Sequence, residues 1–162
     1  MAFSKTTEYV IRILTYMAFC DKELFSARYL HGKLDIPYKY LTNLLHRLNE
    51  YGFLTSVQGK YGGFKFLRNP KDINIYNLVV VFDSDSAFTS CILGLQNCSD
   101  DNPCVMHHEW SKIKEQYIEL FKRTTLEDLK KNSNMRITDI QDPASGHDIL
   151  GSKSLNQLKA GD

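Results

Sequence analysis

A stripe of leucines that leads directly into two strand-like segments is the feature that most constrains how this chain can fold. One face of residues 37–52 carries leucines at the i, i+3, i+4, i+7 spacing of an amphipathic helix, namely Leu41, Leu44, Leu45 and Leu48. Pro37 suits a first helical turn, and Gly52 suits a helix stop. The period then changes from helical to alternating over 53–57 and 64–67. Because glycines lie between these two runs, they predict a hairpin.

Two further helices are expected before this unit. Residues 6–20 place apolar side chains at helical spacing, and a second helix is expected to begin at Ser26. The order helix, helix, turn, helix, hairpin is typical of a winged helix-turn-helix domain, which we assign to residues 1–82. Within it, residues 73–82 are expected to form another helix, with a strand as the alternative because they contain three consecutive valines. The predicted fold class is therefore mainly α with a small β-hairpin.

The rest of the chain divides into a loop, a long helix and a tail. Residues 83–104 are rich in serine, aspartate and asparagine, which indicates a long cysteine-bearing loop. Residues 105–132 predict a long C-terminal dimerisation helix followed by a short helix, and residues 133–162 predict a polar tail. The long helix carries a short heptad seam suited to a partner helix, formed by Trp110, Ile113, Tyr117 and Leu120.

Charge is segregated along the chain, although its total is nearly balanced. Twenty Lys and Arg stand against nineteen Asp and Glu, a formal net charge of +1, which gives no overall bias toward nucleic acid or membrane. Residues 28–68 nevertheless hold seven basic residues and two acidic ones. Because a cationic helix beside a cationic hairpin can displace phosphate counterions, we expect double-stranded DNA as a partner. A basic helix by itself would also be consistent with a solvated surface.

The third helix is expected to enter the major groove, while the hairpin touches an adjacent groove or the backbone. The residues expected to contact DNA are Arg28, Tyr38, Lys39, Tyr40, Asn43, Arg47, Lys60 and Tyr61. The chain shows no plausible nucleophile–base pair and no phosphate-binding loop, so we do not expect an enzyme. It also lacks a signal-peptide core and an apolar run long enough to cross a bilayer, so we expect a cytoplasmic protein with no membrane partner.

Three of the four cysteines, Cys91, Cys98 and Cys104, fall within fourteen residues, and His107 follows shortly after them. This uneven grouping argues against a disulfide framework, and clustered thiolates suit zinc or an iron–sulfur cluster. The gaps between the cysteines are wider than the pairs of most structural zinc sites, which favours a cluster. Zinc, an unmetallated thiol switch and incidental cysteines remain alternatives. Cys20 is expected to be a buried apolar residue.

Several of these segments together resemble one family of regulators. The third helix reads IPYKYLTNLLHRLNEYGFL, and the hairpin reads VQGKYGGFKFL. With the N-terminal segment and the three spaced cysteines, they are similar to the winged-helix regulators that include the iron–sulfur regulator IscR and the nitric-oxide-sensing repressor NsrR. The resemblance covers about residues 1–130.

The resemblance implies a homodimer with two DNA-binding heads, joined by the long C-terminal helix. It also implies an iron–sulfur cluster, [2Fe–2S] or [4Fe–4S], held in each protomer by Cys91, Cys98 and Cys104. The fourth ligand would be His107, as in IscR-like members, or Glu8 donated by the partner protomer, as in NsrR-like members. The implied function is a transcriptional regulator whose operator binding responds to redox state, nitric oxide or cluster supply.

The chain departs from the family pattern in three places. Gln58 stands where an arginine is common in IscR-like members, Thr42 stands where a glutamate is often found, and the first cysteine gap is one residue longer. These differences bear on operator sequence and cluster type. Three alternatives stay open: a zinc-stabilised structural or interaction protein, a small electron carrier, and a cluster-free regulator of the same family, such as those of cysteine metabolism.

Overall fold

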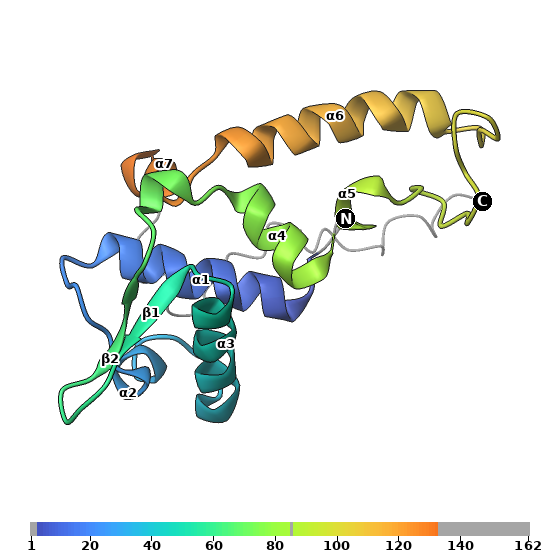
Figure 1. The fold of residues 1–162 in the computed structure, drawn as a ribbon. Helices are drawn as coiled ribbons and strands as arrows, with labels where there is room; N and C mark the ends of the chain where they lie inside the picture. Colours follow the sequence, from blue (N-terminus) through green and yellow to red (C-terminus); the bar gives the residue numbers. More distant parts are fainter. Residues whose placement is uncertain (1–2, 85, 133–162) are drawn as a thin grey trace, which may run out of the picture.

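The computed structural model describes residues 3–84 and 86–132, and helices make up most of it (Figure 1). In chain order, its elements are α1 (Lys5–Phe19), α2 (Ala27–His31), α3 (Tyr38–Glu50), β1 (Leu54–Val57), β2 (Gly63–Phe66), η1 (Pro70–Asp72), α4 (Ile75–Asp83), α5 (Ser86–Thr89), α6 (His107–Arg123) and α7 (Leu126–Asn132). The predicted fold class, mainly α with a small hairpin, is confirmed. The predicted tail, residues 133–162, lies outside the described residues.

The leucine stripe predicted α3 correctly, and all four of its leucines are buried. The helix begins one residue after Pro37, whose φ of −53° leads the chain into the first turn. α1 begins after the cap residue Ser4, whose side-chain oxygen accepts a hydrogen bond from the Thr7 N–H at 3.3 Å. The buried faces of α1 and α3 belong to one hydrophobic core, which also includes residues of α2, the hairpin and α4.

β1 and β2 form the predicted hairpin, an antiparallel pair in which Val57 lies opposite Gly63. A third segment joins it at Phe25, whose N–H donates to the Phe64 carbonyl at 2.9 Å and whose carbonyl accepts from the Phe64 N–H at 2.8 Å. A Cβ atom at Gly63 would lie 2.5 Å from the Phe25 carbonyl oxygen, so this close approach requires glycine. The bridge fixes the hairpin to the segment just before α2.

Residues 73–82 lie mainly in a helix, α4, and the strand alternative is wrong. Asn74 caps this helix, since its side-chain oxygen accepts a hydrogen bond from the Asn77 N–H at 2.8 Å. Leu78 and Val79 are fully buried, because α4 packs against α1 and α6. Burial of this helical face outweighs the local strand preference of the valines.

α6 lies along the side of the molecule away from α3 and the hairpin (Figure 1), and it packs on α4 and α5. Phe88 of α5 is buried, and its ring centroid lies 5.7 Å from that of Tyr117 on α6. α7 follows α6 and packs against α1 and η1. None of the residues of α6 is fully buried, so this helix keeps a long face open to solvent. Within the described residues, no helix has both the length and the apolar character needed to cross a membrane.

Candidate functional site

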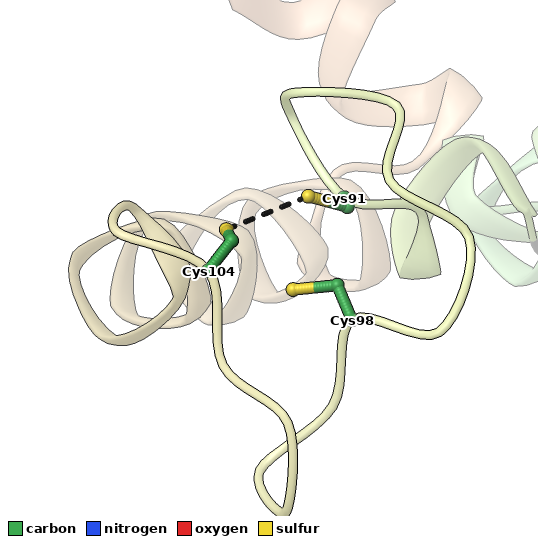
Figure 2. Close-up of side chains that lie close together, drawn as sticks. All are labelled: Cys91, Cys98 and Cys104. Atoms are coloured by element: carbon green, nitrogen blue, oxygen red, sulfur yellow. Dashed lines mark hydrogen bonds between the residues drawn. The ribbon is translucent and has the colours of Figure 1, made fainter.

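The loop between α5 and α6 brings three thiols together at the start of α6. The Sγ atoms of Cys91, Cys98 and Cys104 lie within 4.8 Å of one another, and those of Cys91 and Cys104 are 3.7 Å apart. Figure 2 shows the three side chains pointing toward a common space. All three cysteines are free and partly buried. In the described part of the chain, they form the one group of side chains arranged to hold a metal.

Two tight turns close the wide gaps between these cysteines. In the first gap, Gly94 adopts a φ of +69°, and its N–H donates to the Cys91 carbonyl at 3.0 Å. In the second gap, the backbones of Ser99 and Asn102 exchange two hydrogen bonds, of 3.1 and 3.3 Å. Each turn folds the chain back on itself, so sulfurs that are distant in the sequence reach the same place.

His107, the first residue of α6, contacts this sulfur group from one side. Its Nδ1 atom lies 3.2 Å from Cys98 Sγ, and its Nε2 atom lies 2.8 Å from Asp100 Oδ1. The hydrogen bond with His107 lowers the pKa of Asp100, so this carboxyl is ionised at neutral pH. The sequence indicated His107 but gave no signal for Asp100, because no spacing rule links a loop aspartate to a helical histidine.

One face of α6 holds the loop through side-chain donors. Trp110 Nε1 donates to the Ser90 carbonyl at 3.2 Å, and Lys114 Nζ donates to the Thr89 carbonyl at 3.2 Å. These two residues follow His107 by three and seven positions, so all three share one side of the helix. The loop is therefore fixed to this face of α6 just before its first cysteine.

The surroundings of the loop shift the pKa values of two of the thiols in opposite directions. Partial burial acts to raise the pKa of Cys91, but hydrogen bonds from the backbone at Leu93 and Leu95, and from the neighbouring thiols, lower it to about 7. The backbone at Cys104 acts to lower the pKa of Cys98, yet partial burial and the neighbouring thiols raise it overall. In the metal-free protein at neutral pH, Cys98 therefore keeps its proton more firmly than Cys91 does.

The donor set fits an iron–sulfur cluster, and it also fits zinc. Three soft thiolates are ligands that both prefer, and oxygen donors are not part of the sulfur group. An open cavity of about 270 Å³ lies against Cys98 and Cys104 and is lined by the loop. This cavity gives access to the site from the side of Cys98 and Cys104, and Cys91 is not among its lining residues.

Glu8, the alternative fourth donor, lies in the first turn of α1. Its Oε2 atom pairs with Lys5 Nζ at 2.6 Å. Within one protomer it is not among the residues whose ligand atoms meet in the sulfur group. Its expected role is toward the cysteines of a partner protomer, and this stays a prediction.

The residues expected to contact DNA lie on α2, on α3 and at the tip of the hairpin. Seven of them are exposed: Arg28, Tyr38, Lys39, Tyr40, Asn43, Lys60 and Tyr61. The Tyr38 ring lies edge-on to the His31 ring on α2, with the ring centroids 5.6 Å apart. Tyr40 shares a hydrogen bond of 2.7 Å with the Thr6 hydroxyl on α1. Arg47 is half-buried, with its guanidinium 4.8 Å from the centre of the Phe82 ring on α4. These two side chains therefore help to join α3 to the rest of the molecule.

The expected dimer seam on α6 divides into two pairs. Trp110 and Tyr117 face their own chain, and burial raises the pKa of Tyr117. Ile113 and Leu120 are 53% and 44% exposed. Because these two are seven residues apart, they form an apolar stripe along the solvent side of the helix.

The sequence matches one family of known proteins over most of its length. The profile of the Rrf2 family, described as an iron-dependent transcriptional regulator, matches residues 3–132. A protein of Aquifex aeolicus that carries the name of an HTH-type transcriptional regulator is 34% identical over 131 residues, which are 80% of this chain and 91% of the relative. The regulator NsrR of Bacillus subtilis is 26% identical over 135 residues, which are 82% of this chain and 92% of the relative.

Solved structures of regulators share the fold. CymR, the global cysteine regulator of B. subtilis, matches with a TM-score of 0.68 and 22% identity, covering 83% of this chain and 99% of that protein. IscR of T. potens matches with a TM-score of 0.61 and 22% identity, covering 81% of this chain and 87% of that protein. At this level of identity, the likeness establishes the arrangement of helices and hairpin.

Proposed function

Since the chain belongs to the Rrf2 family of transcriptional regulators, we propose that it acts as a homodimer whose affinity for a DNA operator is set by an iron–sulfur cluster on Cys91, Cys98 and Cys104. Its relatives are DNA-binding regulators of transcription and not enzymes. The signal would be the redox state of the cluster, its reaction with nitric oxide, or its supply.

One observation carries this proposal: three free thiols lie within 4.8 Å of one another in a chain whose family is described as iron-dependent. The three cysteines would hold the cluster from a loop that α6 fixes in place. When bound there, the cluster supplies redox and ligand-exchange chemistry that side chains alone lack.

For the fourth protein donor we propose His107, because its Nδ1 atom lies 3.2 Å from Cys98 Sγ. Glu8, acting from the partner protomer, is the alternative. His107→Ala and Glu8→Gln should be compared by the absorption spectrum of the loaded protein. The substitution that alters the spectrum identifies the ligand, and two unchanged spectra would place the fourth ligand elsewhere.

We propose that α3 and the hairpin form the reading head. Lys39 and Asn43 are exposed on α3, and Lys60 and Tyr61 are exposed at the tip of the hairpin. Cations at these places can replace phosphate counterions, and the exposed face of α3 can enter a major groove. Tyr40 and Arg47 would contribute mainly by fixing the position of α3.

A continuous set of contacts supports coupling between the cysteine loop and this head. α5 leads into Cys91 and packs against α4 and α6, and α4 packs against α1. Asp83, the last residue of α4, accepts hydrogen bonds from the backbone N–H and the hydroxyl of Ser4, the cap of α1. A cluster-dependent change in the loop can therefore favour one arrangement of the two heads. A coupling of about 1 to 3 kcal/mol would change operator affinity about 5- to 150-fold.

The proposal is tested on protein purified without oxygen. We expect iron and sulfide to co-purify with the chain and to give visible absorption. Binding to an operator duplex should weaken steeply as salt rises, and should differ between the loaded protein and the same protein after cluster removal. Identical affinity in both states would contradict control by a cluster, while absence of iron and sulfide would remove the cluster itself.

A zinc-stabilised protein is the second candidate, and one observation favours it. His107 beside three thiols gives the three-cysteine, one-histidine donor set of many structural zinc sites. The same preparation separates the candidates, because zinc is colourless and brings no sulfide. A cluster-free regulator would contain neither metal and would keep its salt-dependent DNA binding.

A further inference from the structure

A chain of three polar groups runs from the solvent to the sulfur group. At its outer end, the Asp100 side chain is 95% exposed, and its Oδ1 atom lies 2.8 Å from His107 Nε2. In the middle, the His107 side chain is only 11% exposed. At the inner end, His107 Nδ1 lies 3.2 Å from Cys98 Sγ. The imidazole therefore connects a loop carboxylate to one of the three thiols.

In the neutral form of this imidazole, the two nitrogens play different roles. An ionised carboxylate only accepts hydrogen bonds, so His107 Nε2 must carry the proton that Asp100 binds. In the neutral imidazole, Nδ1 then holds a lone pair, and this lone pair faces Cys98. In a metal site, a carboxylate on the remote nitrogen of a ligating histidine fixes the tautomer and the ring orientation in the same way.

We propose that Asp100 is a positioning residue, which fixes the His107 imidazole with its proton on Nε2 and its Nδ1 lone pair aimed at the cysteine site. This inference rests on the proposed metal-holding function of the three cysteines. It adds a residue to that site that supplies no ligand atom. Asp100 acts through His107, so its removal matters only while the imidazole is present.

The geometry of the loop brings Asp100 within hydrogen-bond distance of His107. The turn in which Ser99 and Asn102 exchange backbone hydrogen bonds contains Asp100 and Asp101 at its centre. Both aspartates are exposed, and of the two it is Asp100 that is hydrogen-bonded to His107. Asp101→Ala is therefore a matched control for Asp100→Ala, because both remove one exposed carboxylate from the same turn.

The tautomer can be measured on metal-free protein by nitrogen-15 NMR of histidine-labelled chains. We expect the wild-type His107 signals to report a proton on Nε2 and none on Nδ1. In Asp100→Ala, the two nitrogens should move toward averaged signals, while Asp101→Ala should match wild type. A proton on Nδ1 in the wild type, or unchanged signals in Asp100→Ala, would overturn the proposal.

Cobalt(II) titration of the metal-free protein gives the second readout. Asp100→Ala should weaken cobalt binding about 10- to 100-fold, and the conservative Asp100→Asn, which keeps an acceptor oxygen, should restore part of the loss. In a His107→Ala background, Asp100→Ala should have no further effect. An equal loss in that background would show that Asp100 supports the loop independently of His107, and would overturn its positioning role.

The two readouts separate this inference from the function on which it rests. If the wild-type chain binds neither cobalt nor a cluster, the proposed metal-holding function fails. The NMR measurement still decides, in that case, whether Asp100 orients His107. If the wild type binds metal normally and Asp100→Ala behaves like Asp101→Ala, only the inference about Asp100 fails.

Discussion

Trp110 Nε1 donates a hydrogen bond of 3.2 Å to the carbonyl oxygen of Ser90, the residue that leads into Cys91. The heptad spacing of α6 predicts that Trp110 belongs to a dimer seam, yet its indole N–H is directed to the loop of its own chain. Because the loop has little other regular structure, this bond helps to set where the first thiol lies.

Trp110→Phe should therefore weaken metal binding while keeping an aromatic ring on α6. Loss of one hydrogen bond costs about 1 kcal/mol, which corresponds to about a fivefold lower affinity for cobalt(II). Titration of the metal-free protein measures the effect, with Lys112→Ala on the same helix as control. A change in oligomeric state with unaltered cobalt affinity would instead assign the indole to the seam.

Replacing any one of Cys91, Cys98 and Cys104 by alanine should abolish cluster loading, because their sulfurs form one group. Cys20 is the matched control, since it is also free and partly buried but lies at the end of α1. Iron and sulfide analysis of anaerobic protein should show full content in Cys20→Ala and loss in the other three. Full retention in Cys98→Ala would remove Cys98 from the site.

Lys39→Ala should weaken DNA binding without affecting the fold, because Lys39 is exposed on α3. Because the proposed homodimer carries Lys39 twice, the variant should reduce the steepness of log affinity against log salt by about 1.8, which is about 0.9 for each lost phosphate contact. Arg47→Ala should in addition lower stability, since its guanidinium lies on the Phe82 ring. Fluorescence anisotropy over a salt series measures the slope, with Lys112→Ala as control. An unchanged slope in Lys39→Ala would exclude Lys39 as a phosphate contact.

Ile113→Glu together with Leu120→Glu should shift a dimer toward monomer, because both side chains lie on the exposed apolar stripe of α6. Burying two carboxylates without partners opposes association. Sedimentation equilibrium measures the change. Glu115→Lys, which inverts a charge at an exposed position two residues from Ile113 and five from Leu120, and therefore off their face of the helix, is the control. A dimer of wild-type strength in the double variant would place the interface elsewhere.

Thr125 and Asp128 cap α7, and their loss should destabilise the fold. The Thr125 hydroxyl accepts from the Asp128 N–H at 3.1 Å, and the Thr125 N–H donates to Asp128 Oδ2 at 3.0 Å. Thr125→Ala should lower the free energy of unfolding by about 1 kcal/mol. The hydrogen bonds from Thr125 lower the pKa of Asp128 below its ordinary 3.8.

The stabilisation from Asp128 is therefore present above pH 3.8 and is lost as pH falls through its lower folded pKa. Urea unfolding of the wild type and of Asp128→Asn, each at pH 7 and at acid pH, measures the stabilisation that ionised Asp128 contributes. We expect the difference in the free energy of unfolding between the two proteins to be smaller at acid pH than at pH 7. A difference that stays constant would show that ionisation of Asp128 does not stabilise the cap.

The sequence predicted the elements whose signals are local. The four leucines of α3 specify one buried face by their spacing alone, and the glycines between β1 and β2 mark the hairpin. α4 was open between helix and strand because three valines favour extended chain, while only the packing of α4 between α1 and α6 decides for helix. The three cysteines could also be recognised as candidate ligands, because their grouping in the sequence is a local signal.

What the chain determined by itself is thus its order of helices and hairpin and the presence of clustered thiols, because periodicity and residue type act over a few neighbours. The tertiary structure alone decided which groups meet: Phe25 with Phe64, Asp100 with His107, and Trp110 with Ser90. It also decided that Ile113 and Leu120 face solvent. These outcomes depend on how a loop and several helices pack in space, and no spacing along the chain encodes that packing.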